Sequence, residues 1–366
     1  MVCEKVVVGA ETEYPLNGLL TLPDGAVEPV PAVVMVHGSG PSDMDERVRK
    51  LTPFKDLAQG LASHGIASLR YDKRTFAYGR KAAKAIPTVR EETIEDALRA
   101  TDILKRDSRV DRNRVFVLGH SMGAMLAPRI DAEGADAAGL ILMAATPYRL
   151  EDVVLRQLEQ AGNSRPVLGK VFKLEHRFFR KKFDGLYQMS DEDARRKKFA
   201  GGISLYYFKE MGQKTAVDYL LENEKPVLVL QGGRDVQVLA DDDFAQLQSL
   251  LADRDNTTFR LYPELNHAFV HALYDDILKA SKEFGTERHI GEEVVADIAA
   301  FVKSNASGCT QGTVPRVQPL ARPNSGDSPL CATFIQANST PKRYARDELS
   351  VVMVMDWKRF SINSLS

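Results

Sequence analysis

The sequence predicts an α/β fold: a doubly wound, mostly parallel sheet that carries an inserted helical cap. Short apolar runs alternate with amphipathic helical patterns along most of the 366 residues, which is the order of elements typical of parallel sheets with crossover helices. Most of these runs are apolar throughout, as expected for strands covered by helices on both faces. One long segment, 148–225, contains helical pieces but no good strand, which indicates an insertion over one end of the sheet.

The predicted strands define the sheet. Six apolar runs are predicted as its parallel strands: 31–38, 66–71, 115–119, 140–145, 226–232 and 259–263. Before them, residues 4–11 and 16–25 alternate more clearly between apolar and polar positions. Such alternation is typical of strands with one solvated face, so an antiparallel edge is expected there.

Helical patterns connect these strands. Five helices outside the cap are predicted, at 52–65, 93–107, 122–130, 242–252 and 291–304. In the first, Thr52 is placed to cap the N-terminus and Gly65 suits the C-terminal exit. In the second, Thr93 and Asp96 have the spacing of a capping box, with Asp in place of the usual Glu.

The chain is therefore expected to have three parts. Residues 1–147 and 226–304 form the α/β core, and residues 148–225 form the helical cap. The remaining residues, 305–366, are rich in Pro, Gly and Ser at their start and are predicted to be a partly disordered extension. Within it, ELSVVMVMDW is predicted as one strand or a short helix without an obvious partner.

Composition excludes several classes of protein. The chain is 44% hydrophobic and 27% charged, as in soluble globular proteins, and its net charge of −1 provides no field to attract nucleic acid. Three scattered cysteines predict neither a disulfide framework nor a metal site. The N-terminus lacks the apolar run of a signal peptide, and no window reaches the roughly 18 apolar residues of a membrane span. We expect a cytoplasmic protein without a membrane span, metal or nucleic-acid partner.

The stretch VFVLGHSMGAMLAP, residues 115–128, places Ser121 in a G-x-S-x-G pattern between a strand and a helix. In this context the pattern is a nucleophile elbow, in which a strained turn presents the serine hydroxyl above the sheet. Gly119 and Gly123 are expected because side chains there would collide as strand and helix approach each other. The alternative is a tight turn with an incidental serine.

A serine nucleophile needs a base that is itself oriented by an acid, in the chain order Ser, acid, His. Asp235 follows the strand at 226–232, and His267 follows the strand at 259–263, so both are predicted to join Ser121. The rival acids begin the next helix, where the helix dipole favours negative charge. The rivals are Asp241, Asp242 and Asp243 for the acid, and His271 and His289 for the base.

The loop after the strand at 31–38 is predicted to complete an oxyanion hole. The backbone N–H of Met122 is one expected donor and that of Ser39 is the other, with Gly38 and Gly40 as alternatives. Two histidines nearby, His37 and His120, are interpreted as structural, because the first precedes the nucleophile in the chain and the second points away from such a turn.

These motifs resemble those of the α/β-hydrolase superfamily, and more narrowly those of bacterial serine esterases of the dienelactone-hydrolase-like and serine-aminopeptidase-like group. The resemblance covers roughly residues 5–304. It rests on VVMVHGSGPSDMDE, RYDKRTFAYG, GHSMGAMLAPRI, LQGGRDVQV and YPELNHAF. It implies hydrolysis of carboxylic esters, usually with short acyl chains, without cofactor or metal, and it puts Ser121, Asp235 and His267 on the triad positions. Dienelactone hydrolases themselves use a cysteine nucleophile, so the serine is a departure from that namesake.

The expected partner is a small-molecule ester, and the sequence leaves a homodimer open. The alternatives on the same triad are a peptidase or amidase and an acyl thioesterase; a non-catalytic binding protein is a third. Basic clusters at 176–183 and 194–199 favour an ester over a peptide amine and are otherwise interpreted as solvated helix faces. Aromatic residues of the cap are predicted either to line an acyl pocket or to pack on one another. The stretch Asp72–Arg74 is interpreted as a local ion pair.

Overall fold

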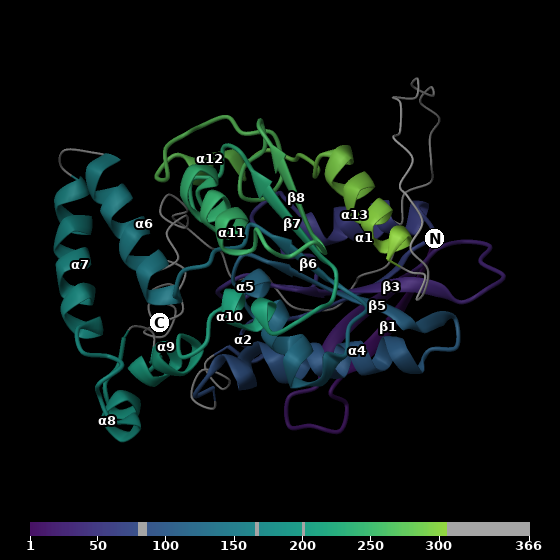
Figure 1. The fold of residues 1–366 in the computed structure, drawn as a ribbon, viewed down its shortest axis with the longest axis horizontal. Coiled ribbons are helices and arrows are strands. Elements are labelled where there is room, and N and C mark those ends of the chain that lie inside the picture. Colours follow the sequence, from purple (N-terminus) through teal and green to yellow (C-terminus); the bar gives the residue numbers. More distant parts are fainter. Residues whose placement is uncertain (80–85, 165–167, 200–201, 306–366) are drawn as a thin grey trace, which may run out of the picture.

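The computed structural model describes residues 1–79, 86–164, 168–199 and 202–305, and its centre is one sheet (Figure 1). The strand order within the described residues is β1-β2-β4-β3-β5-β6-β7-β8. The strands are β1 (Val2–Val8), β2 (Leu16–Leu22), β3 (Val30–Val36), β4 (Ala67–Tyr71), β5 (Val110–His120), β6 (Leu140–Met143), β7 (Val227–Gly232) and β8 (Thr257–Tyr262). β3 to β8 are parallel, whereas β1 and β2 add antiparallel at one edge, which confirms the predicted sheet.

Helices cover both faces of this sheet. Outside the cap they are α1 (Pro53–Ser63), α2 (Arg74–Tyr78), α4 (Glu95–Arg106), α5 (Met122–Ile130), α11 (Ala245–Leu250), α12 (Ala280–Glu283) and α13 (Glu292–Ser304). In the part of the chain that the structure describes, three π-helical turns adjoin them: η1 (Arg90–Ile94), η2 (Asp131–Ala135) and η3 (Ala240–Phe244). In Figure 1, α1 and α13 lie on one side of the sheet and α4 and α5 lie on the other.

The two faces have separate hydrophobic cores, because successive side chains of a strand point to opposite sides. In β3, Val33 and Met35 belong to the core under α1 and α13, whereas Val34 and Val36 belong to the core under α4 and α5. All four side chains are fully buried. Continuous apolar runs thus predicted central strands correctly.

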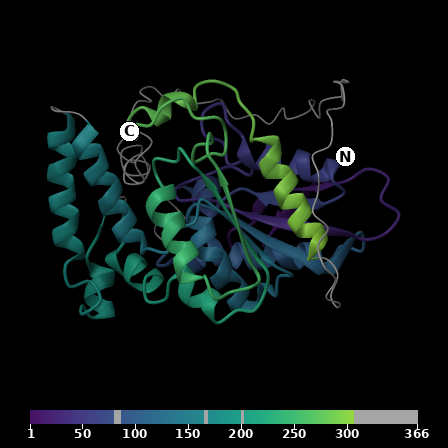
Figure 2. The ribbon, with the colours of Figure 1, turned by 45° about the horizontal axis from the view of Figure 1, so that its top comes forward.

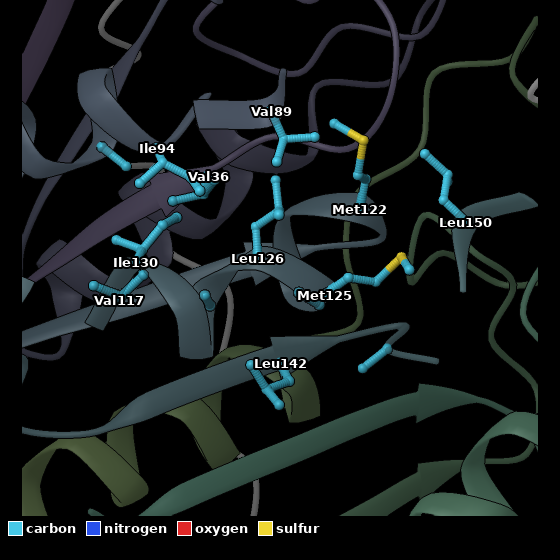
Figure 3. Close-up of a cluster of buried hydrophobic side chains, with 14 of the residues drawn as sticks. Val36, Val89, Ile94, Val117, Met122, Met125, Leu126, Ile130, Leu142 and Leu150 are labelled. Carbon is cyan, nitrogen blue, oxygen red and sulfur yellow. The ribbon is translucent and has the colours of Figure 1, made fainter. Parts of the chain in front are cut away.

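Helix α5 lies deep in the second core, and all its residues except Arg129 are buried. Figure 3 shows its side chains among those of the central strands and of the segments beside them. The residues labelled there are Val36, Val89, Ile94, Val117, Met122, Met125, Leu126, Ile130, Leu142 and Leu150. Each buried side chain of this size contributes about 1.5–3 kcal/mol, so α5 is held firmly where it leaves the sheet.

The predicted helix ends are partly wrong. Gly65 has φ +77°, as expected at a helix exit, but the Thr52 side chain makes no capping hydrogen bond. The capping box at Thr93 and Asp96 does not form, because the helix begins earlier, at η1, and Thr93 lies inside it. Asp96 instead accepts two hydrogen bonds from Arg74, at 3.0 and 2.6 Å, so a tertiary partner replaces the local one.

The expected helical insertion lies between β6 and β7 in the chain. It comprises α6 (Leu150–Ser164), α7 (Leu168–Phe183), α8 (Asp191–Arg196), α9 (Leu205–Met211) and α10 (Ala216–Leu221). Figures 1 and 2 show α6 and α7 side by side at the outer end of the molecule, and Figure 1 shows α10 beside α5. The predicted extension, 305–366, lies outside the described residues except for Asn305, and so does its ELSVVMVMDW segment.

The described residues contain neither a candidate membrane span nor a candidate metal cluster. None of the helices there has the length and apolar character required to cross a bilayer. No group of three or more His, Cys, Asp or Glu side chains in those residues is arranged to hold a metal ion.

Candidate active site

Ser121 occupies a strained turn between β5 and α5. Its backbone has φ +54° and ψ −118°, in a region that residues with a Cβ rarely adopt. Its N–H donates to the carbonyl of Met143 at 2.8 Å, so the neighbouring strand β6 holds the turn. Ser121 is buried, with 8% of its surface exposed.

The flanking glycines are required by close backbone contact. A Cβ on Gly119 would lie 2.1 Å from the carbonyl oxygen of Gly123, and a Cβ on Gly123 would lie 2.2 Å from that of Val36. Both distances are far below van der Waals contact, and the atoms met are backbone atoms that cannot rotate away. The G-x-S-x-G pattern therefore records the close approach of β5, α5 and β3.

Asp235 and His267 are in direct contact. His267 Nδ1 lies 2.7 Å from Asp235 Oδ2, and the Asp235 side chain is fully buried. The other oxygen, Oδ1, accepts hydrogen bonds from the N–H groups of Gln237 and Val238, at 2.8 and 3.0 Å. A carboxylate held in this way is fixed in direction, its hydrogen bonds replace those lost with water, and it fixes the orientation of the imidazole through Nδ1.

The loop that carries Asp235 and the loop that carries His267 are in close contact at Gly232. A Cβ on Gly232 would lie 2.6 Å from the carbonyl oxygen of Asn266, the residue before His267. Asn266 is itself buried: its Oδ1 accepts from the N–H of Ala268 at 3.0 Å, and its Nδ2 donates to Glu283. The Asn266–Glu283 contact was not predicted from the sequence, because Glu283 lies 17 residues further along the chain and belongs to no motif.

His267 lies beside the serine turn. Its carbonyl oxygen accepts from His120 Nε2 at 2.9 Å, and the two imidazole centroids are 4.8 Å apart. Among the hydrogen bonds of the described residues, none joins the Ser121 hydroxyl to the His267 ring. Such contacts are often long without substrate and shorten in the reactive complex.

The rival acids and bases have other partners. Asp242 and Asp243 pair with Arg156 of α6, at 2.8 and 2.6 Å, so they fasten the cap to η3 rather than only capping a helix. His289 lies on Asp56 at 3.1 Å with its side chain mostly exposed, and His271 is also exposed. Of the predicted candidates, Asp235 and His267 are the pair that meets.

The loop after β3 passes directly over the serine. A Cβ on Gly38 would lie 3.3 Å from the Cβ of Ser121. The Gly38 N–H already donates to Glu46 Oε1 at 2.8 Å, which removes Gly38 from the predicted oxyanion donors and leaves Ser39 and Gly40. Met122 is the first residue of α5, so its N–H has no partner within the helix.

Glu46 also binds His120, which joins this loop to the elbow. Glu46 Oε2 lies 3.1 Å from His120 Nδ1, and both side chains are buried. Burial favours the neutral form of each group, but their mutual attraction outweighs it, lowering the pKa of Glu46 and raising the pKa of His120. They form a buried ion pair.

His37 has a different environment. Burial lowers the pKa of His37 to about 4, so its ring is neutral near pH 7. Its Nε2 donates to the carbonyl of Asp43 at 3.0 Å, across the loop that contains Gly38. This position matches the expected loop-shaping contact.

Asp72, Lys73 and Arg74 do not form the local ion pair that was predicted. Each binds a different element: Asp72 accepts from the N–H of Met44, Lys73 pairs with Glu92, and Arg74 pairs with Asp96. All three side chains are buried. The roles of Glu46, Lys73 and Glu92 were not found from sequence, because their partners are far apart in the chain and ion pairs leave no periodic signal.

The aromatic residues of the cap pack mostly on one another. Phe179, Phe183, Phe199 and Phe208 form a buried cluster with centroid distances between 4.4 and 5.3 Å. Phe178 is 54% exposed. The four clustered phenylalanines therefore fit the packing interpretation better than that of an acyl pocket, whereas Phe178 is not part of the buried cluster.

A strained serine between a parallel strand and a helix, with an aspartate and a histidine from later loops, is the arrangement of α/β hydrolases. The pattern of the alpha/beta hydrolase family matches residues 33–280, which is more than half of the chain. The chain therefore belongs to the alpha/beta hydrolase family.

The chain is also similar to individual esterases in sequence and in fold. The chain is 36% identical to Esterase EstD of Thermotoga maritima over 295 residues, which cover 80% of this chain and 67% of that protein. Its fold is similar to that of Est1E from Butyrivibrio proteoclasticus, with TM-score 0.52 and 15% identity over 82% of this chain and 98% of that one. It is also similar to the fold of an esterase of Pyrococcus furiosus, with TM-score 0.51 and 16% identity over 83% of this chain and 91% of that one. At such identities the two structures show the fold alone.

Proposed function

We propose that this protein is a serine esterase whose reaction runs through an acyl-enzyme on Ser121. The observation that carries the proposal is the 2.7 Å contact between His267 and the buried Asp235, next to a serine in a strained turn. That the bond cleaved is a carboxylic ester is supported by the identity with Esterase EstD.

The roles of the residues follow from their positions. His267 accepts the Ser121 proton through Nε2 as the hydroxyl attacks the ester carbonyl, and Asp235 stabilises the imidazolium that forms. The N–H groups of Met122 and Ser39 hold the negative charge on the carbonyl oxygen. The alcohol leaves with the proton from His267, and water then hydrolyses the acyl-enzyme by the same route.

The proposed substrates are esters of short acyl chains. The cap aromatics support this preference, because they fill space against one another rather than lining a long apolar channel. A panel of p-nitrophenyl esters from acetate to palmitate, with an aminoacyl anilide and an acyl thioester beside it, tests the choice. We expect kcat/KM to be highest for acetate and butyrate; a preference for the anilide or thioester would overturn the ester assignment.

The nucleophile is tested by substitution. Ser121→Ala is expected to lower kcat for p-nitrophenyl acetate at least about 10³-fold, because the covalent route is lost. Ser249→Ala, at an exposed position of α11, is the matched control and should keep full activity. A fluorophosphonate probe should label the parent and the control but not Ser121→Ala. Activity retained in Ser121→Ala, with its circular dichroism unchanged, would refute the proposal.

A further inference from the structure

Lys73 is buried at the side of the active-site loop, with its side chain only 2% exposed. Its Nζ donates to the carbonyl oxygen of Gly38 at 2.8 Å and lies 3.1 Å from Glu92 Oε1. Lysine is almost never buried unless it is paired, and a buried ion pair contributes little net stability relative to apolar packing. Stability alone therefore does not explain why Lys73 and Glu92 are buried as a pair.

The atom that Lys73 binds belongs to the peptide that carries the proposed oxyanion donor. The Gly38 C=O and the Ser39 N–H are parts of one planar peptide unit, which is trans, so they point in opposite directions. Fixing the C=O against Lys73 fixes the direction of the N–H. The hydrogen bond also polarises the peptide and strengthens the N–H as a donor.

The peptide on the other side of Gly38 is held as well. The Gly38 N–H donates to Glu46 Oε1 at 2.8 Å, and Glu46 is ion-paired with His120. Gly38 has no side chain to restrain it, so these two contacts, from Glu46 and from Lys73, determine its orientation above Ser121. Preorganised donors of this kind give much of the rate in acyl transfer.

The Lys73 contact continues into the cap. Glu92 Oε2 accepts a hydrogen bond from the hydroxyl of Tyr207, which lies in α9 and is 1% exposed. The same hydroxyl lies 3.7 Å from the sulfur of Met122, the residue whose N–H is the other proposed donor. One cap tyrosine thus contacts the Met122 side chain directly and is connected to the Gly38–Ser39 peptide through Glu92 and Lys73.

We infer that Lys73 is a positioning residue that orients the Gly38–Ser39 peptide for oxyanion binding, and that Glu92 and Tyr207 couple this orientation to cap helix α9. The inference rests on the proposed function, because it assigns a role to residues around the same nucleophile. Lys73 acts through the peptide and contacts no substrate.

The test separates transition-state binding from substrate binding. Lys73→Met keeps the length of the side chain and removes the charge and the donor. We expect kcat for p-nitrophenyl acetate to fall about 10²- to 10³-fold, as for loss of an oxyanion donor, with KM changed less than about twofold. Affinity for a trifluoromethyl ketone, which forms a tetrahedral adduct with the serine, should fall in parallel with kcat.

Tyr207→Phe tests the coupling with a smaller change and is used also if Lys73→Met does not fold. It leaves the Lys73–Glu92 pair in place and removes one hydrogen bond, so kcat should fall about 3- to 10-fold at constant KM. Asp96→Asn is the control, since it breaks the neighbouring buried pair with Arg74, which does not contact Gly38. It should lower the melting temperature and leave kcat unchanged.

The outcomes distinguish this inference from the proposed function. If Ser121→Ala is inactive while both Lys73→Met and Tyr207→Phe keep the parent kcat and inhibitor affinity, the positioning role is wrong and the esterase mechanism stands. If Lys73→Met and Tyr207→Phe change kcat only as much as Asp96→Asn does, their effect is structural and the inference is also overturned.

Discussion

At the scale of single residues, the site depends on charged groups that are buried in pairs. Glu46 illustrates this: it binds the Gly38 N–H with one oxygen and His120 with the other. A buried charge is costly when its partner is removed, because the remaining ion is left without compensation. The residues nearest the serine are therefore sensitive to changes that remove one charge.

Glu46→Gln is expected to destabilise the fold by about 3 kcal/mol near pH 6. Because folding raises the pKa of His120, this histidine contributes its full stabilisation below about pH 6.5, the pKa of an unfolded histidine. That contribution to the free energy of unfolding is lost as the pH rises through the raised pKa of the folded state. The lowered pKa of Glu46 means that its share is complete above about pH 4.3 and is lost as pH falls through that pKa. The pair thus stabilises most between these values.

Urea unfolding of parent and variant at pH 6 and pH 9 checks this. The difference between them should be larger at pH 6, and Glu192→Gln, in an exposed pair, should show almost no difference at either pH. An equal loss at both pH values would mean that Glu46 and His120 are not an ion pair.

At the scale of elements, the elbow joins a strand to a helix with no room for side chains. β5, α5 and β3 approach so closely that only hydrogen fits at the α-carbons of Gly119 and Gly123. A short local pattern can therefore indicate a candidate site, because the glycine spacing reflects how closely three elements must pack.

Gly123→Ala is expected to destabilise the protein by about 3 kcal/mol or more, because the new methyl overlaps the backbone of β3. Gly25→Ala is the matched control: Gly25 has φ +67° and nothing within 4 Å of an added Cβ, so it measures conformational cost alone, about 1 kcal/mol. Chemical denaturation of both variants gives the comparison. A Gly123→Ala protein no less stable than Gly25→Ala would contradict the close packing.

At the scale of the whole molecule, the cap shares a hydrophobic cluster with the core, and buried polar contacts add to this packing where α6 meets η3. Arg156 of α6 reaches Asp242 and Asp243 of η3, and Tyr148 and Thr146, just before α6, bind the same two carboxylates at 2.5 Å each. Asp243 is fully buried, so this junction is sensitive to loss of the arginine.

Arg156→Met is expected to loosen the cap by about 2–3 kcal/mol, because it leaves the Asp243 carboxylate without its cation. Hydrogen exchange of amides in α6 should speed up, while that of β5 stays unchanged. Arg196→Met, in an exposed pair within α8, is the control and should change little, since such pairs are worth about 0–1 kcal/mol. Unchanged exchange in α6 would show that other contacts hold the cap.

The sequence by itself determined the parallel sheet, the position of the helical insertion and the candidates Ser121, Asp235 and His267. These features leave local signals: apolar runs mark buried strands, and glycine at fixed spacing marks close backbone approach. The helix starts were predicted less well, since Thr93 lies inside a helix that begins at η1.

Only the tertiary structure decided which polar groups meet. In the structure, Asp235 contacts His267 and the Gly38 N–H donates to Glu46. Asp96, which was predicted to belong to a helix cap, accepts from Arg74. Buried polar groups must find partners wherever the fold puts them, and in these three pairs the partners are 32, 8 and 22 residues apart in the chain. No spacing rule in one dimension contains that information, because it is created when the strands assemble.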